Sequence, residues 1–444
     1  MPEPFANVEQ TTAPKPASGF SGEDIPAYED YAHCVHCGLC LNHCPTYKLW
    51  GLEADSPRGR IRQIVLVDQG RLPLGDSFVQ HIDQCLDCRA CETACPSGVE
   101  YGKLVEAARA QIEQNYRRPF FSRLTRNLVF RDLLPYPRRI AFLGRLLYFY
   151  QRSGLQSLVR ATGILRPFGL ADREKLLPPI DRKFFFSNLG RTYPAMGHRR
   201  ARVALFAGCV AQVSFSALHE ATIRVLTANG CEVVVPAGQT CCGALAAHAG
   251  VRDVARSLAR INLRIFLGDE FDAIVTNAAG CGSTLKEYEH LFTPGTEEYG
   301  EAHAFREKMR DVTEFLADLG PSAHLASLPM RVTYQDSCHL LHGQKVREAP
   351  RKLLRAIPGV ELVEMAMADY CCGSAGSYNV TETQTSLALL AEKMKHARAT
   401  NAPVIVTANP GCLLQMRAGA EIHATGQEVL HVIELLDRAL PKNL

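Results

Sequence analysis

Seventeen cysteines are the residues of this 444-residue chain that point most directly to a chemistry. Eight of them form two runs of one spacing, Cys34-x2-Cys37-x2-Cys40-x3-Cys44-Pro45 and Cys85-x2-Cys88-x2-Cys91-x3-Cys95-Pro96. A loop with a thiolate at every third residue directs three sulfurs at one cubane, and the fourth cysteine, before proline, reaches the neighbouring cluster. The two runs therefore predict two 4Fe-4S clusters in a protein that carries electrons.

This crossing of the fourth cysteine divides the eight thiols into two predicted ligand sets. A structural zinc site is disfavoured because zinc takes four ligands and not two interleaved sets. A disulfide scaffold is disfavoured because such scaffolds belong to short secreted chains, whereas these cysteines cluster in motifs. The expected sets are Cys34, Cys37, Cys40 and Cys95 for the first cluster, and Cys44, Cys85, Cys88 and Cys91 for the second.

After residue 200 the sequence repeats itself, with an offset that stays between 129 and 131 residues. A period this long indicates two copies of one domain, because solenoid repeats run about 20–50 residues. The matching segments are RVALFAGC (202–209) with RVTYQDSC (331–338), Cys241-Cys242-Gly243 with Cys371-Cys372-Gly373, and VTNAAGC (275–281) with VTANPGC (406–412). The copies are called the first repeat (201–325) and the second repeat (326–444).

In both repeats the cysteines follow short apolar segments that are predicted to be strands. Ligands bind at the carboxyl ends of strands in an open α/β sheet, so each set is expected to hold an iron-sulfur cluster or zinc. Core packing of free cysteines is the alternative. It is the prediction for Cys231, whose place in the second repeat is taken by Val360. The sets are Cys209, Cys241, Cys242 and Cys281 in the first repeat, and Cys338, Cys371, Cys372 and Cys412 in the second.

The elements that must position these thiols can also be predicted. Strands alternate with helical patterns in both repeats, a βαβ rhythm that indicates a parallel sheet covered by helices. Between the two N-terminal runs, Ser56, Pro57 and Gly70 are start and stop signals of a helix. The expected fold class is α/β with an N-terminal α-helical domain. The expected order is a flexible leader (1–25), a two-cluster α-helical domain (26–112), a basic helical segment with a linker (113–200) and the two repeats.

The segment 117–170 holds eleven arginines and a single acidic residue, Asp132. Within it, RRIAFLGRLLYFYQR combines basic positions with apolar ones at spacings of three and four. This pattern is typical of an amphipathic helix on an anionic membrane surface. A helix that packs across two domains and leaves its arginines in solvent is the alternative.

Composition narrows the class of protein and its compartment. The net charge of +3 is too small to indicate nucleic acid as a partner, and no basic-aromatic recognition motif is present. The start MPEPFANVEQ lacks the basic and apolar parts of a signal peptide, and no segment approaches the ~20 apolar residues of a membrane span. We expect a cytoplasmic protein, peripheral on the inner face of the cell membrane.

The full order of motifs resembles the glycolate oxidase iron-sulfur subunit family. The N-terminal part is similar to the α-helical ferredoxin domain of succinate dehydrogenase iron-sulfur subunits, and the repeats are similar to the CCG pair of the heterodisulfide reductase B subunit. The heterodisulfide pattern closes each copy with Cys-x-x-Cys, whereas Gly282-Ser283-Thr284 and Leu413-Leu414-Gln415 follow the last cysteines here. Four thiolates per copy remain, enough for a conventional cubane. The strings that carry the likeness are CVHCGLCLNHCPTY, DSPRGRI, CLDCRACETACPSGV, CCGSAGSY and IVTANPGC.

The resemblance implies an electron-transfer subunit of a glycolate dehydrogenase complex, with two 4Fe-4S clusters and one or two more in the repeats. FAD-binding partner subunits would oxidise glycolate, and a quinone or other membrane acceptor would take the electrons. No flavin and no catalytic residue are expected on this chain, since it has no G-x-G-x-x-G after a strand. D-lactate or glycerol-3-phosphate as the substrate, and a thiol-disulfide enzyme, are the alternatives.

Several charged residues and histidines stand near the cysteines in sequence. His339 and His342, beside Cys338, are expected either to relay a proton or to fill a surface or packing role. The remaining candidates would tune cluster potentials or act as solvated surface charges: Arg58, Arg60, His33, His36 and Arg89.

Overall fold

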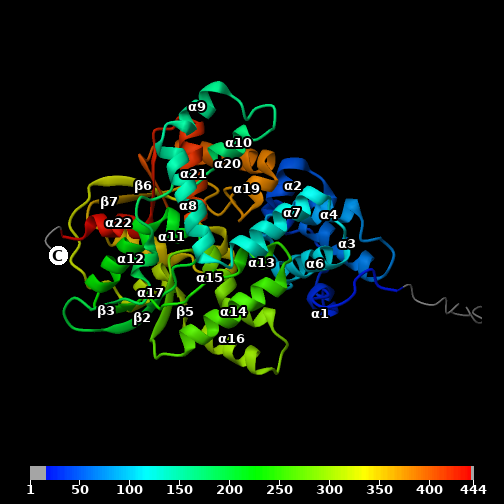
Figure 1. Ribbon diagram of the computed structural model, residues 1–444, viewed down its shortest axis with the longest axis horizontal. Coiled ribbons are helices and arrows are strands. Elements are labelled where there is room, and N and C mark those ends of the chain that lie inside the picture. Colours follow the sequence, from blue (N-terminus) through cyan, green and yellow to red (C-terminus); the bar gives the residue numbers. More distant parts are fainter. Residues whose placement is uncertain (1–16, 442–444) are drawn as a thin grey trace, which may run out of the picture.

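The computed structural model of the protein describes residues 17–441. Figure 1 shows a helical N-terminal domain, in blue, beside two α/β domains that run from green to red. The predicted class, α/β with an N-terminal α-helical domain, is confirmed. Within the described residues, no helix combines the length and apolar character that a membrane crossing requires.

The N-terminal domain packs three longer helices around a small core. The predicted helix between the cysteine runs is present as α3, where the Ser56 side chain accepts from the Gly59 N–H and Pro57 takes the first position. Ile64, Val67 and Leu104 are fully buried between these helices. The elements are α1 (Tyr28–Ala32), η1 (Leu41–His43), α2 (Pro45–Trp50), η2 (Glu53–Asp55), α3 (Pro57–Asp68), α4 (Asp76–Asp83), α5 (Ala90–Thr93) and α6 (Tyr101–Asn115).

The end of the predicted leader is bound to the rest of the molecule. Phe20 is 4% exposed and packs against Phe78, with 6.2 Å between ring centroids. Asp24 forms an ion pair with Arg252 of the first repeat at 3.1 Å. A flexible leader over 1–25 is therefore wrong for residues 17–25, because an aromatic ring and a carboxylate find buried partners. Residues 1–16 lie outside the described part of the chain.

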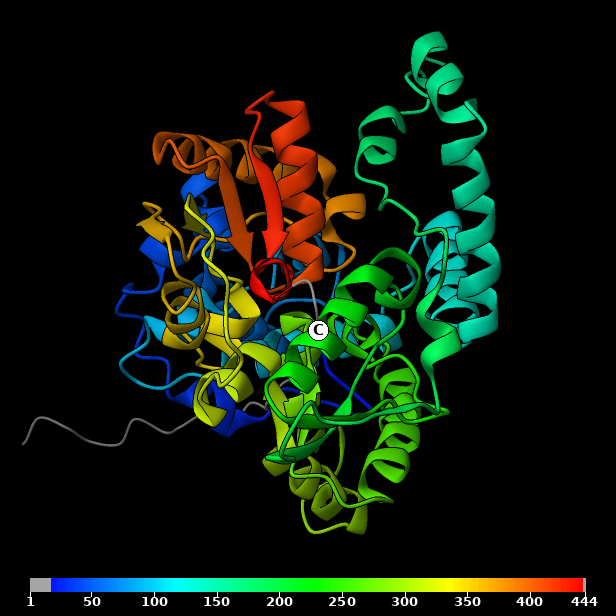
Figure 2. The same ribbon diagram turned by 90° about the vertical axis from the view of Figure 1, so that its left-hand side faces the viewer.

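The basic segment, residues 117–170, lies along one side of the molecule and is here called the arm. It is coloured cyan to green in Figure 2. The amphipathic helix predicted from RRIAFLGRLLYFYQR is α8. One face of α8 is packed, since Ile140 is buried with Ile180 and Val213. The elements are α7 (Phe120–Arg126), η3 (Asn127–Leu133), α8 (Pro137–Arg152), α9 (Leu155–Thr162), α10 (Ala171–Lys175) and η4 (Phe185–Asn188).

The sheet of the first repeat has the order β1-β3-β2-β4-β5, and its edge strand β1, which comes from the preceding linker, is the only antiparallel strand. Cys231 lies on β3 and is fully buried, so its predicted core role is confirmed. The strands are β1 (Thr192–Tyr193), β2 (Ala201–Leu205), β3 (Cys231–Val234), β4 (Ala273–Thr276) and β5 (Met309–Asp311). The helices are α11 (Ala211–Ser214), α12 (Ser216–Ala228), α13 (Ala244–His248), α14 (Arg252–Leu267), α15 (Ala279–Lys286), η5 (Tyr288–Leu291), α16 (Glu297–Lys308) and α17 (Val312–Leu319).

The second repeat has the all-parallel order β7-β6-β8-β9, which matches β3-β2-β4-β5 strand for strand. One continuous hydrophobic core joins the repeats, with Val203 and Val332 both fully buried in it. The strands are β6 (Met330–Tyr334), β7 (Val360–Glu364), β8 (Val404–Thr407) and β9 (Glu428–His431). The helices are η6 (His339–Gly343), α18 (Glu348–Arg355), α19 (Tyr378–Thr381), α20 (Thr383–Ala399), α21 (Pro410–Ile422) and α22 (Val432–Ala439).

Candidate metal centres

Five cysteines of the N-terminal domain surround a space near its surface, here called the outer hollow. Its empty volume is about 430 Å³. Left-handed backbone at His36 and Gly38, with φ of 54° and 87°, turns the loop between successive thiols. Cys37 is exposed, so this hollow opens to solvent. The cysteines that line it are Cys34, Cys37, Cys40, Cys91 and Cys95.

A second space, the inner hollow, lies deeper and has an empty volume of about 290 Å³. The loop around it again uses left-handed backbone, at Asp87 and Arg89, with φ of 52° and 59°. The Asp87 N–H donates to Sγ of Cys85 at 3.3 Å, as backbone donors do in cluster sites. The cysteines that line the inner hollow are Cys44, Cys85, Cys88 and Cys91, all buried.

The fourth cysteine of each run lines the hollow that is formed mainly by the other run. This is the placement that the predicted crossing of the fourth cysteines requires. Cys95 lines the outer hollow and not the inner one, and Cys44 lines the inner and not the outer. All seventeen cysteines are free thiols. Burial raises the pKa of Cys88 and of Cys91 well above that of an ordinary thiol. Binding of iron would therefore displace their protons. The outer hollow, with five thiols including the shared Cys91, and the inner hollow, with four, each offer the four thiolates that a 4Fe-4S cluster takes.

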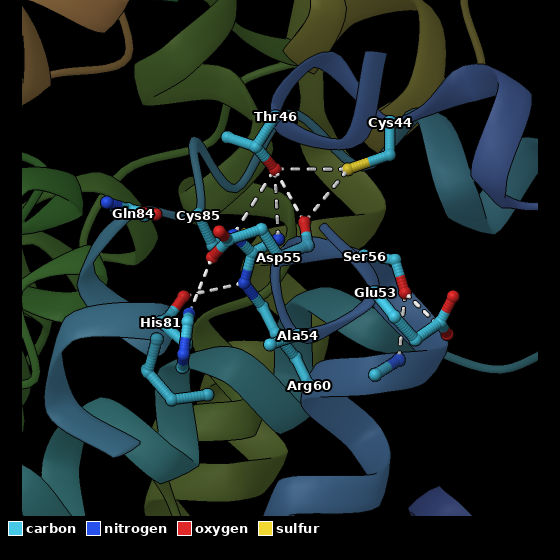
Figure 3. Close-up of polar contacts among 12 residues, drawn as sticks. Cys44, Thr46, Glu53, Ala54, Asp55, Ser56, Arg60, His81, Gln84 and Cys85 are labelled. Carbon is cyan, nitrogen blue, oxygen red and sulfur yellow. Dashed lines mark hydrogen bonds and ion pairs between the residues drawn. The ribbon is translucent and has the colours of Figure 1, made fainter. Parts of the chain in front are cut away.

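A buried cation lies beside the inner hollow. Figure 3 shows the Arg60 guanidinium, which donates from Nε to the His81 carbonyl at 2.6 Å and reaches Thr46 Oγ1 at 3.2 Å. Asp55 Oδ1 lies 3.3 Å from Arg60 and 2.9 Å from His81 Nδ1. Burial opposes the charge of Arg60, but the inner-hollow cysteines raise its pKa. Arg60 is therefore not a solvated surface charge. Its position beside the thiols fits the predicted role of tuning the reduction potential of a cluster in the inner hollow.

The cysteines of the first repeat gather at the carboxyl ends of its strands, as predicted. Cys209 follows β2, the Cys241–Cys242 pair follows β3, and Cys281 lies in α15 after β4. The Gly243 N–H donates to Sγ of Cys241 at 3.5 Å. A hydrogen bond to Cys241 and burial raise the pKa of Cys209, so these thiols lie within reach of one another.

The second repeat reproduces this arrangement. Cys338 follows β6, the Cys371–Cys372 pair follows β7, and Cys412 lies in α21 after β8. The Gly373 N–H donates to Sγ of Cys371 at 3.5 Å.

All eight repeat cysteines line one shared space between the repeats, here called the chamber. Its empty volume is about 1550 Å³. The sequence predicted one site per repeat, and it did not indicate that the two sites would face each other. Four thiols from each repeat, with a backbone donor at one sulfur of each set, fit iron-sulfur ligation on both sides of the chamber.

The inner hollow adjoins the second repeat's side of the chamber. The side chains of Cys88 and Cys371 pack together with Tyr370 and Tyr378 in one small hydrophobic core. Burial, and next the thiol of Cys371, raises the pKa of Cys88. The Tyr378 hydroxyl donates to the Gln84 carbonyl at 3.0 Å, which ties the N-terminal domain to the second repeat. The outer hollow adjoins the inner hollow, because Cys91 lines both. The inner hollow adjoins the chamber, because Cys88 packs beside Cys371. The three spaces therefore follow one another through the molecule.

A buried charged group at the junction of the three domains was missed by sequence reasoning. His248 Nδ1 lies 2.7 Å from Glu106 Oε1 and 3.0 Å from Asp87 Oδ2. Arg89 forms ion pairs with Glu287 and with both of those carboxylates. Burial opposes protonation of His248, but its bonds to Asp87 and Glu106 raise its pKa to about 9. These ion pairs around His248 hold the N-terminal domain against the first repeat.

The remaining histidines and arginines that the sequence singled out fall into two kinds. His339 Nε2 lies 2.8 Å from the Asp87 carbonyl, and His342 Nδ1 lies 2.9 Å from Thr93 Oγ1. These contacts fit a packing role between the N-terminal domain and the second repeat, and a proton relay through either histidine stays a prediction. His33 and His36 are exposed, and Arg58, partly exposed, pairs with Glu53.

Three family models match the chain in the predicted order. One described as "4Fe-4S dicluster domain" matches residues 30–99. One described as "Glycolate oxidase iron-sulfur subunit, linker region" matches residues 121–177. One described as "Cysteine-rich domain" matches twice, at residues 203–286 and 332–417.

Two curated relatives match over nearly the whole chain, and a third matches over about half of it. The "Probable glycolate oxidase iron-sulfur subunit" of Bacillus subtilis (strain 168) is 41% identical over 91% of this chain and 93% of its own length. The "Glycolate oxidase iron-sulfur subunit" of Escherichia coli (strain K12) is 31% identical over 92% and 94%. The "Lactate utilization protein A" of Oceanobacillus iheyensis is 32% identical over 53% of this chain and 96% of its own length.

Proposed function

Because the chain belongs to the family of glycolate oxidase iron-sulfur subunits, we propose that it is the electron-transfer subunit of a glycolate-oxidising complex. FAD-binding partner subunits oxidise glycolate, and this chain carries the electrons onward to a quinone or another membrane acceptor. The observation that carries the proposal is the unbroken succession of cysteine-lined spaces. It leads from exposed Cys37 through the shared Cys91 to Cys88, which packs beside Cys371.

Iron-sulfur clusters supply reversible one-electron storage at each of these places. We assign the outer hollow to the set that includes Cys95 and the inner hollow to the set that includes Cys44. The chamber takes one or two further clusters, one on each repeat's four thiols. The chain's own residues insulate these sites: Arg60 and Arg89 are buried beside the inner hollow, and His339 and His342 close the junction around it.

A second candidate is the same electron role in D-lactate oxidation. The similarity to "Lactate utilization protein A" favours it over other hydroxy acids, since that protein matches over 53% of this chain. Substrate specificity resides on the partner subunit, and an electron carrier serves either substrate with the same residues.

We also propose that the arm attaches the complex to the inner face of the membrane. Arg138, Arg145 and Arg152 follow one another at intervals of seven on α8, and all three are exposed. Beside them Phe142 and Phe149 are 62% and 66% exposed. An exposed apolar stripe flanked by arginines suits the headgroup region of an anionic bilayer. The opposite face of α8 carries the interdomain packing that was the alternative, so one helix serves both contacts.

Purification of this chain without its partners tests the proposal. The isolated chain is expected to contain iron and sulfide but no flavin, and to leave glycolate unoxidised with any dye as acceptor. Addition of the flavoprotein subunit should restore dye reduction by glycolate. Turnover by the isolated chain would show a complete enzyme and overturn the relay function.

A further inference from the structure

The two repeats differ in charge at one fully buried position under their cysteine pairs. Gly243 packs on Ala255 of α14, where an added Cβ would lie 3.3 Å from its Cα. Gly373 packs in the same way on Ser386 of α20. The two helices therefore correspond position for position from these contacts onward. Seven residues further along each helix stand Asn262 in the first repeat and Lys393 in the second.

Asn262 supports the cysteine pair of the first repeat as a neutral amide. Its Nδ2 donates to the Cys241 carbonyl at 3.0 Å, and its Oδ1 accepts from the Thr240 N–H at 3.1 Å. The amide thus fixes the backbone at the cysteines, and it brings no net charge there.

Lys393 supports the corresponding loop of the second repeat with a cation. Its Nζ donates to the carbonyls of Met367 and Ala368 at 2.6 and 3.1 Å, just before the cysteine pair. Among residues 17–441, no carboxylate lies within 4.0 Å of this ammonium, and the carboxylate of Asp336 is instead paired with Arg351 at 2.8 Å. Burial lowers the pKa of Lys393, and the thiols of Cys372 and Cys371 are the first groups that oppose this. The geometry thus places a buried cation, without a carboxylate in salt-bridge contact, against the loop that leads into the second repeat's cysteine pair.

A cluster that accepts one electron gains one negative charge, with no bond made or broken. A nearby buried cation stabilises that reduced form, and its effect is large because the surroundings are poorly polarisable. We propose that Lys393 raises the reduction potential of the cluster on the second repeat above that of the cluster on the first. This inference rests on the proposed function, because it requires a cluster on each repeat. An electron from the inner hollow, which adjoins Cys371, then settles first on the second repeat.

Redox titration of the anaerobically purified whole chain, followed by electron paramagnetic resonance, tests this. The signal that is lost in C372S belongs to the second repeat, and the signal that is lost in C242S belongs to the first. The second repeat's signal is expected at the higher potential. K393Q should move the second repeat's signal to lower potential and leave the first repeat's signal in place, whereas K393R, which keeps the charge, should move neither. K395Q is the matched control, since Lys395 lies on the same helix and is exposed, paired with Glu392.

N262K gives a second route if K393Q loses iron, because a cation in the first repeat should raise the potential of that repeat's signal. Unchanged potentials in K393Q and N262K proteins that retain their iron would overturn this inference and leave the proposed function intact. A wild-type chain with iron on the N-terminal cysteines alone would remove both the chamber clusters and this inference.

Discussion

For a single cysteine, its place in the run decides which hollow its thiol faces. The first three cysteines of each run lie on one loop, and the fourth begins the segment that leaves it. Spacing of this kind is local, so the grouping of the cysteines around the two hollows could be predicted from sequence, and their ligation of clusters stays a prediction. The group around His248 was not, because its members come from three distant segments that meet only when the domains dock.

Substitution of single ligands tests the crossed assignment. Cys44→Ala should abolish the spectroscopic signal of the cluster held by Cys85, Cys88 and Cys91, and Cys37→Ala should abolish the other. Cys231→Ser is the control, because Cys231 lines neither hollow and lies in the strand core. Loss of the signals in the reverse sense would refute crossing.

The His248 contacts predict a pH dependence of stability. A pKa raised to about 9 from 6.5 means that the contribution is fully present below pH 6.5 and is lost as the pH rises through 9. Its upper limit is about 3.4 kcal/mol, from ~1.4 kcal/mol for each pKa unit. Urea unfolding at pH 6 and at pH 9.5 should show a larger loss for the wild type than for His248→Gln. Equal losses in both proteins would show that His248 is not held charged by Asp87 and Glu106.

Among the elements, α8 shows what periodicity can and cannot predict. The spacing of RRIAFLGRLLYFYQR predicts a helix with an apolar face, and the helix is present. It does not reveal that Ile140 and Gly144 lie on a packed face while Phe142 and Phe149 lie on an exposed one. Which apolar stripe is buried depends on the surface against which the helix packs, and that surface combines Ile180 and Phe184 of the linker with Val213 of the first repeat.

Charge reversal on this helix tests the membrane attachment. Each basic residue near an anionic surface contributes ~1 kcal/mol, so Arg138→Glu with Arg145→Glu should weaken binding of the complex to anionic vesicles by roughly 30-fold or more. Co-sedimentation at low salt measures this. The control reverses Arg347 and Arg398, two exposed arginines of the second repeat. Equal binding by both variants would contradict attachment through the arm.

In the whole molecule, duplication and docking together create the chamber. Each repeat could be predicted with its four cysteines, because strand ends and motifs recur in register. That both sets line a single space, and that Cys88 abuts it, depends on how three domains pack. The second repeat therefore lies next to the inner hollow, and the first repeat faces the second repeat across the chamber.

In the proposed complex, electrons from glycolate enter this chain through its partner and travel along its cysteine-bound clusters. Anaerobic mixing of glycolate with the assembled complex, followed by rapid freezing and electron paramagnetic resonance, measures it directly. We expect reduced clusters on this chain before any acceptor is added, and we expect the chamber clusters of a Cys88→Ala variant to stay oxidised. Clusters that stay oxidised in the wild-type complex while its flavin is reduced would contradict this transfer of electrons.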